Sequence, residues 1–257
     1  MSDRTVMTSV EHLYEDTAAL VGGVAAAMEA ACRDAIALRG AAWLALAGGR
    51  TPLPVYAHLA RAGLGGRIDA VPTDDRCVPH DHQACNLRNL REAFAGNAFA
   101  RPSREGGNDA ALLQPAETTI SVHPITAANG DIDASLAQSR ALLAAHPEPF
   151  DAVLLGMGAD GHIASLFPGA ANLRDGLAMD SGIDAIATLP EPLPPEAPFA
   201  RISLTLPRLL RACAVHLVVT GHDKRAVLRE VLQAPSTPLP VAALLRAGAP
   251  IHVHWSP

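Results

Sequence analysis

FDAVLLGMGADGHIASLFPG, residues 150–169, is the stretch that decides the fold. Its apolar beginning predicts a buried strand, and its closely spaced glycines predict a tight turn that leads into a helix. His162 directly follows Asp160 and Gly161 in this turn. A turn at the end of a strand can hold an imidazole at a pocket, with a carboxylate close enough to orient it. The stretch therefore predicts an α/β unit and a candidate general base.

The order of strand, glycine turn and helix recurs along the chain. Residues 41–47 form an apolar run that ends at Gly48 and Gly49, and residues 214–221 form another before a helix from His222. This alternation predicts an α/β fold, with a Rossmann-like, mostly parallel sheet and helices on both faces. The other predicted elements are helices at about 10–39 (stopped by Gly40), 52–63, 86–94 and 131–146, strands at 67–75, 118–125, 201–206 and 251–255, and loops at 96–118 and 190–198.

Composition limits the class of protein. The chain has 257 residues, of which 49% are hydrophobic and 18% charged, and no repeat or linker divides it, so we expect a single domain over 1–257. A net charge of −6 without long runs of like charge argues against nucleic-acid binding. Four scattered cysteines do not suggest a disulfide framework. The N-terminus lacks a signal-peptide pattern, and no apolar run reaches the roughly 18–20 residues that span a membrane. We expect a cytoplasmic protein.

Four turns follow predicted strands, and ligands of parallel sheets bind beyond the carboxyl ends of the strands. Together these turns hold glycine backbone N–H groups, two arginines, a lysine and several carboxylates. They are Gly48-Gly49-Arg50-Thr51, Asp74-Asp75-Arg76, the turn at 158–162 and the turn at 221–224, which contains Lys224. The first could cradle an anion at a helix N-terminus, although a plain strand-to-helix turn is an equally good interpretation.

Two motifs suggest other chemistry. GMGADG at 156–161 matches the G-x-G-x-x-G fingerprint of dinucleotide binding, but it lies past the middle of the chain and places Asp160 where a pyrophosphate would be repelled. DDRCVPHDHQACN at 74–86 has the spacing of a zinc site, with Cys77, His80, His82 and Cys85 as its ligands. The turn at Pro79 makes it difficult to point all four inward.

The chain resembles the 6-phosphogluconolactonase family over about residues 43–230. The family has an SGG-x-TP loop, a DER-x-VP-xx-H-xx-SN segment, an FD-xx-LLG-x-G-x-DGH-x-ASLFPG segment, an RITLT strand and a G-xx-K turn. The matching segments here, in the same order, are AGGRTP, DDRCVPHDHQACN, FDAVLLGMGADGHIASLFPG, RISLT and GHDK. Cys77 and His80 fall on variable positions of the family and Cys85 replaces a serine. The resemblance thus favours a substrate loop over a zinc site.

The resemblance implies hydrolysis of 6-phospho-D-glucono-1,5-lactone to 6-phosphogluconate, the second step of the oxidative pentose phosphate pathway. His162 is expected to be the general base, while Asp160 and Asp74 shape the polarity of the pocket. The groups expected to bind the phosphate and the developing oxyanion are Arg76, Lys224, Gly48, Gly49, Arg50, Thr51 and Gly158, with Arg201 as a weaker candidate. Neither a metal, an organic cofactor nor an obligatory protein partner is required.

The sequence leaves two alternatives open. One is a glucosamine-6-phosphate deaminase or isomerase, whose motif has a glutamate seven residues after the aspartate. Here that position holds Phe167. The other is a sugar-phosphate sensor without activity, which has no need of the Asp-Gly-His turn. The chain also departs from the family at position 75, where Asp75 replaces the family's glutamate. We expect this carboxylate to orient Arg76. Ala47 replaces a second family serine.

Overall fold

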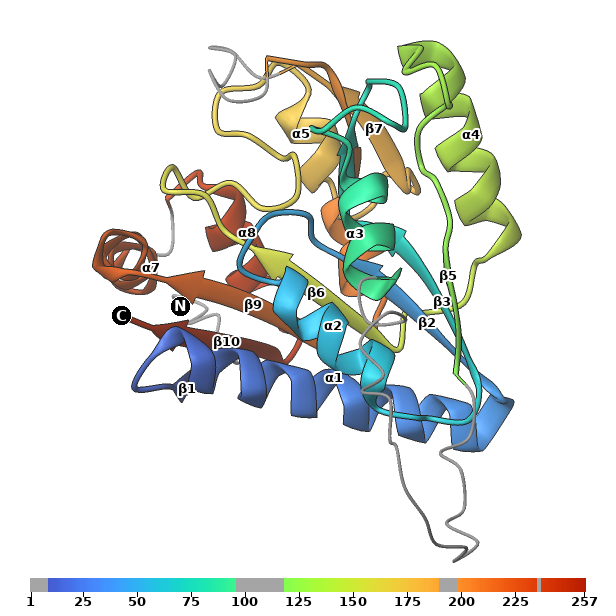
Figure 1. Ribbon diagram of the computed structural model, residues 1–257. Helices are drawn as coiled ribbons and strands as arrows, with labels where there is room; N and C mark the ends of the chain where they lie inside the picture. Colours follow the sequence, from blue (N-terminus) through green and yellow to red (C-terminus); the bar gives the residue numbers. More distant parts are fainter. Residues whose placement is uncertain (1–8, 96–117, 190–197, 235–236) are drawn as a thin grey trace, which may run out of the picture.

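A seven-stranded parallel sheet forms the centre of the molecule (Figure 1). The computed structural model describes residues 9–95, 118–189, 198–234 and 237–257. The strand order of this sheet is β1 (Ser9–Leu13), β10 (Ile251–Ser256), β9 (Val215–Thr220), β6 (Ala152–Gly156), β2 (Ala41–Leu46), β3 (Arg67–Pro72) and β5 (Thr119–Val122). A three-stranded antiparallel sheet contains β4 (Asp74–Arg76), β8 (Arg201–Leu204) and β7 (Ala185–Thr188). The predicted α/β class is confirmed.

Helices cover both faces of the large sheet, as predicted (Figure 1). They are α1 (Thr17–Arg39), α2 (Leu53–Arg61), α3 (Asn86–Ala95), α4 (Ile132–Ala145), α5 (Leu173–Leu177), α6 (Leu206–Leu210), α7 (His222–Gln233) and α8 (Pro240–Arg246). The residues of β2 are apolar throughout because the strand is buried on both faces. Leu44 packs with α1 to α3, while Trp43 and Ala45 pack with the core on the other face. A strand buried on both sides has no polar face.

The structure corrects three of the predicted elements. The helix predicted from Val10 begins only at Thr17, where the Asp16 side chain accepts a hydrogen bond from the Ala19 N–H. The preceding residues form β1, because their backbone pairs with β10 from the far end of the chain. The strand predicted over 67–75 divides at Thr73 into β3 and β4, which belong to different sheets.

The third correction concerns residues 157–172, where the predicted helix does not form. The segment makes turns and isolated bridges instead, and α5 starts only at Leu173. Ala164 has a φ of 48°, a left-handed conformation that interrupts any right-handed helix. By contrast, Gly40 ends α1 in the left-handed conformation, as predicted. The predicted loops at 96–118 and 190–198 lie almost entirely outside the described residues, and no helix within the described ranges is long and apolar enough to cross a membrane.

Four histidines form a cluster on β1, β9 and β10, in which His216 and His254 are buried and His12 and His252 are half-buried. His12 Nε2 lies 3.1 Å from His252 Nδ1, and His216 Nδ1 lies 3.0 Å from His254 Nε2. The Tyr14 hydroxyl lies 2.9 Å from His254 Nδ1 and can donate to it. Burial, together with the charges of neighbouring histidines, lowers the pKa of His216 to about 4 and that of His254 to about 3. His216 and His254 are therefore neutral in the folded protein near neutral pH.

Because of these buried histidines, we expect the free energy of unfolding to fall at acidic pH. Both pKa values lie below the ordinary 6.5, so the unfolded chain binds more protons than the folded one below that pH. Stability is thus full above about pH 6.5 and is lost as pH falls towards 4, with a slope that approaches about two protons. Denaturant unfolding between pH 7.5 and 4.5 measures the slope. The double variant His216→Gln, His254→Gln should flatten it, whereas His58→Gln on the exposed side of α2 should not. An unchanged slope in the double variant would contradict the assignment.

Candidate functional site

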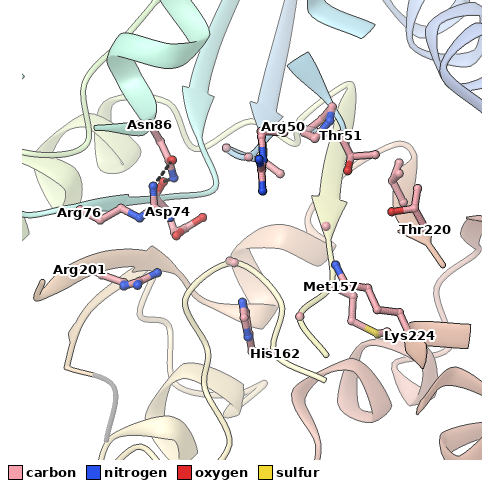
Figure 2. Close-up of a pocket in the computed structure, with 18 residues that line it drawn as sticks. Arg50, Thr51, Asp74, Arg76, Asn86, Met157, His162, Arg201, Thr220 and Lys224 are labelled. Carbon is pink, nitrogen blue, oxygen red and sulfur yellow. Dashed lines mark hydrogen bonds between the residues drawn. The ribbon is translucent and has the colours of Figure 1, made fainter. Parts of the chain in front are cut away.

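A pocket of about 380 Å³ opens at the carboxyl ends of β2, β6 and β9, beside β4 and β8. Every residue predicted from the sequence to be catalytic or to bind substrate lines it except Asp160, which instead contacts His162. The pocket also includes residues that the sequence analysis did not select for the site: Ala47, Pro52, Asn86, Gly156, Met157, Ala164, Val218 and Thr220. Figure 2 shows His162 between Arg201 and Lys224, with Arg50 and Thr51 across the pocket.

The His162 imidazole is oriented by Asp160. Its Nδ1 lies 2.6 Å from Asp160 Oδ1, which also accepts a hydrogen bond from the His162 backbone N–H. Burial raises the pKa of Asp160, but the hydrogen bonds and charge of His162 outweigh it and hold the pKa below its ordinary value. An ionised carboxylate can only accept, so Nδ1 carries the proton. Nε2 is then the basic nitrogen of the ring.

Gly158 makes room for this ring. A Cβ atom at Gly158 would overlap the His162 imidazole and would lie 2.5 Å from Asp160 Oδ1. Only a residue without a side chain lets the turn fold this tightly around the pair. The middle glycine of GMGADG is therefore needed because the His162 imidazole packs directly against the backbone there.

Phe167 supports the other side of the imidazole. The two ring centroids lie 4.3 Å apart, and the Arg201 guanidinium lies 5.0 Å from the Phe167 centroid. Burial lowers the pKa of Arg201, attraction to Asp74 raises it and repulsion by Arg76 lowers it. Phe167 thus occupies, with an apolar ring, the position where the deaminase motif has a glutamate.

Asp74 is a buried carboxylate at the wall of the pocket. Its exposure is 7%, and its Oδ2 accepts a hydrogen bond of 2.5 Å from the Ser165 hydroxyl. The backbone N–H of Ser165 in turn donates to Ser203 Oγ on β8. The left-handed Ala164 places Ser165 for these contacts. The contact between Ser165 and Asp74 joins the 150–169 segment to β4, across 91 residues of sequence.

The structure corrects the role predicted for Asp75. This carboxylate does not bind the Arg76 guanidinium but accepts hydrogen bonds from the backbone N–H groups of Arg76, Asn86 and Leu87. It therefore fixes the start of α3 against β4. The Arg76 guanidinium is held by the side-chain oxygen of Asn86 and the backbone oxygen of Ala84.

Backbone groups and cations form the opposite wall. Gly49 has a φ of 99°, which favours glycine, and leads towards α2, whose N-terminus has no side-chain cap. Lys224 lies in the first turn of α7, which likewise lacks a side-chain cap. Helix N-termini attract anions, and a lysine beside them strengthens that attraction. This wall is suited to bind a phosphate.

The residues considered as zinc ligands have other contacts. His80 Nε2 lies 2.9 Å from the Thr126 backbone oxygen, and Cys85 Sγ donates to Asp75 Oδ2 at 3.4 Å. His82 Nδ1 accepts from the Ala84 N–H. Within the part of the chain that the structure describes, no group of three or more His, Cys, Asp or Glu residues is arranged to hold a metal ion.

The fold and site define a class: an α/β protein with a histidine–aspartate pair, and a pocket lined by three arginines and a lysine, at the ends of its parallel strands. The chain belongs to the glucosamine-6-phosphate isomerase/6-phosphogluconolactonase family, whose model matches residues 15–255. It is 32% identical over 248 residues to the 6-phosphogluconolactonase of Pseudomonas putida, a match that covers 96% of this chain and 92% of that protein. It is 35% identical over 243 residues to that of Pseudomonas aeruginosa, covering 91% and 90%.

A solved structure shows the same likeness. The crystal structure of a 6-phosphogluconolactonase from Shewanella baltica matches with a TM-score of 0.78 and 26% identity, over 98% of this chain and all of that one. The resemblance on which the sequence analysis relied is confirmed at the level of the family.

Proposed function

We propose that the chain hydrolyses 6-phospho-D-glucono-1,5-lactone to 6-phosphogluconate, the second step of the oxidative pentose phosphate pathway. The observation that carries the proposal is the His162–Asp160 pair in a pocket lined by Arg50, Arg76 and Lys224. Hydrolysis of a phosphorylated lactone requires a base that activates water and cations that bind the phosphate, and this pocket offers both. The proposal is also supported by relatives named 6-phosphogluconolactonase, whose sequences match nearly the whole chain.

In the proposed mechanism His162 Nε2 takes a proton from water as the water attacks the lactone carbonyl. Asp160 holds the proton on Nδ1 and stabilises the imidazolium that forms. The ring then returns a proton to the leaving ring oxygen. A lactone already reacts with water, so no nucleophilic side chain is required.

Cations and backbone N–H groups bind the charges of the substrate. The wall with Gly49, Arg50 and Lys224 holds the phosphate, which places the lactone ring over His162. Arg76 and Arg201 lie on the other side, where negative charge develops on the carbonyl oxygen. Binding at the distant phosphate thus orients the carbonyl for attack.

Lys224→Ala should mainly raise KM. The variant loses a charge-assisted hydrogen bond to the phosphate, worth about 1.5–3 kcal/mol, so KM should rise about tenfold to a hundredfold with a smaller change in kcat. Arg229→Ala removes the same charge from an exposed position of α7 and is the matched control. Steady-state kinetics of both variants test the role, which an unchanged KM in Lys224→Ala would exclude.

One assay set separates the proposed activity from that of the deaminase. Freshly generated lactone is supplied and its decay is corrected for spontaneous hydrolysis, and glucosamine 6-phosphate is supplied in parallel with ammonia release followed. We expect lactone hydrolysis without ammonia release. The reverse pattern would show a deaminase, and Phe167 beside His162 argues against it.

The same proposal gives the setting of the reaction. We infer that residues 1–257 act as a single domain in the cytoplasm, on a small phosphorylated lactone, without nucleic acid, membrane, cofactor or obligatory protein partner. The four cysteines are free, which is usual for a reducing compartment.

A further inference from the structure

Asn86 connects three parts of the pocket. It is the first residue of α3, it is 2% exposed, and its backbone N–H donates to Asp75 Oδ1. Its side chain lies against the backbone of Gly48, where a Cβ atom would overlap the amide. Asn86, the first residue of α3, therefore contacts both β4 and the turn at Gly48.

Both ends of the Asn86 amide have a defined partner. Oδ1 accepts a hydrogen bond of 2.7 Å from Arg76 Nη1, and Nδ2 donates one of 2.7 Å to the Asp74 backbone oxygen (Figure 2). A guanidinium can only donate and a carbonyl can only accept, so the amide has one orientation that satisfies both. The side chain is fixed in that orientation.

This arrangement leaves one edge of Arg76 for a ligand. Nη1 donates to Asn86 and also to the Ala84 backbone oxygen, so both of its hydrogens are used. Nε is buried without a hydrogen-bond partner, and no carboxylate among the described residues forms an ion pair with Arg76. A planar fork held on one side presents its other nitrogen, Nη2, in a fixed direction.

We propose that Asn86 is a positioning residue for Arg76, which it aims at the substrate without neutralising its charge. The inference rests on the proposed function, because it assigns Arg76 to an anionic substrate. An aspartate at position 86 could hold the guanidinium equally well, but it would form an ion pair with Arg76 and place a second negative charge in an anion pocket. The neutral amide fixes the fork and leaves the positive charge to the ligand.

Asn86→Asp separates this role from a structural one. Aspartate is as good as asparagine at the beginning of a helix, and its charge favours the first turn. If Asn86 serves only the start of α3, the folded Asn86→Asp variant keeps its activity. The carboxylate loses the Nδ2 hydrogen bond to the Asp74 backbone oxygen, so the melting temperature should fall somewhat under either role. The positioning role predicts in addition that the folded variant has a kcat/KM lower by about tenfold or more, mostly through kcat, because Arg76 faces the carbonyl oxygen where charge develops. Asn89→Asp, one turn further along α3, is the matched control and should keep the wild-type kcat/KM.

A double-mutant cycle tests whether Asn86 acts through Arg76. Asn86→Ala alone should lower kcat/KM by about tenfold to a hundredfold, because the guanidinium loses its orientation. In the Arg76→Ala background the same change should cost less than about twofold, since nothing remains to be positioned. Equal losses in both backgrounds, or an Asn86→Asp enzyme with wild-type kinetics, would overturn the proposal.

A binding measurement keeps this test independent of turnover. Calorimetric titration with 6-phosphogluconate should show weaker binding to Asn86→Asp than to the wild type. If the wild-type chain fails to hydrolyse the lactone, the proposed function fails, while the titration still decides the role of Asn86 at an anion pocket. Equal affinity of both proteins for 6-phosphogluconate would overturn the proposal even if the wild type is active.

Discussion

His162→Ala is expected to hydrolyse the lactone about 10² to 10⁴ times more slowly than the wild type, the usual contribution of a general base. The loss should appear in kcat, because the variant retains Lys224, Arg50 and the turn at Gly49, the groups proposed to bind the phosphate. Stopped-flow or continuous pH measurement with fresh substrate gives kcat and KM, and calorimetric titration with 6-phosphogluconate gives the affinity of the product.

The control for this variant addresses packing. The His162 ring lies against Phe167, so its removal takes an aromatic contact from the pocket as well as a base. His162→Phe restores a ring but no basic nitrogen and should be as slow as His162→Ala. A phenylalanine variant with wild-type kcat would show that the ring, and not its Nε2, matters for the reaction.

Gly158→Ala is expected to lower kcat by about 10²-fold, although it removes no functional group. A methyl group at this position overlaps the imidazole and presses on Asp160, so the pair must move from its place in the turn. Displacement of a catalytic group by about 1 Å can cost this much. Kinetics with the fresh lactone measure the loss, and the melting temperature reports whether the fold survives.

Gly22→Ala is the matched control for that substitution. Gly22 lies in the interior of α1 with no atom within 4 Å of an added Cβ, so alanine should stabilise the helix by about 0.5–1 kcal/mol. Its kinetics should be those of the wild type. If Gly158→Ala were as active as Gly22→Ala, the tight approach of His162 to the backbone would have no role in the reaction.

The parts of the fold that depend on local pattern could be predicted from the sequence. The run at 41–47 is apolar throughout because β2 is buried on both faces, and Gly40 ends α1 because the chain takes a left-handed turn there. The elements that were wrong depend on distant partners. Residues 9–13 continue a helical pattern, but they pair with β10 about 240 residues away, and no local signal records that pairing.

The candidate site shows the same division. The turns with Gly49, His162 and Lys224 could be placed together because parallel strands end at one edge of a sheet, and Arg76 lies in β4 just beyond the end of β3. Asn86 was not selected for the site from the sequence. Its role became visible when the structure showed its amide between Arg76 and the Asp74 backbone, a contact that the helical pattern of α3 does not encode.

Ser165 and Asp75 were hidden for related reasons. Ser165 lies where the sequence predicted a helix, so its hydroxyl was not assigned to Asp74. Asp75 lies beside Arg76 in sequence, which suggested an ion pair, whereas its buried carboxylate binds three backbone N–H groups. Burial raises the pKa of Asp75 and these three hydrogen bonds lower it, with a net rise. At both positions the decisive hydrogen bonds join residues that are distant in sequence, which a local pattern does not reveal.

The most direct test of His162-dependent lactone hydrolysis is the decay of freshly generated 6-phospho-D-glucono-1,5-lactone, measured side by side with no protein, wild-type chain and His162→Ala. Substoichiometric wild-type chain should accelerate the decay far beyond the spontaneous rate, with 6-phosphogluconate as the product, and His162→Ala should lose most of this acceleration. Decay at the spontaneous rate with the wild-type chain, or equal acceleration by His162→Ala, would contradict this expectation.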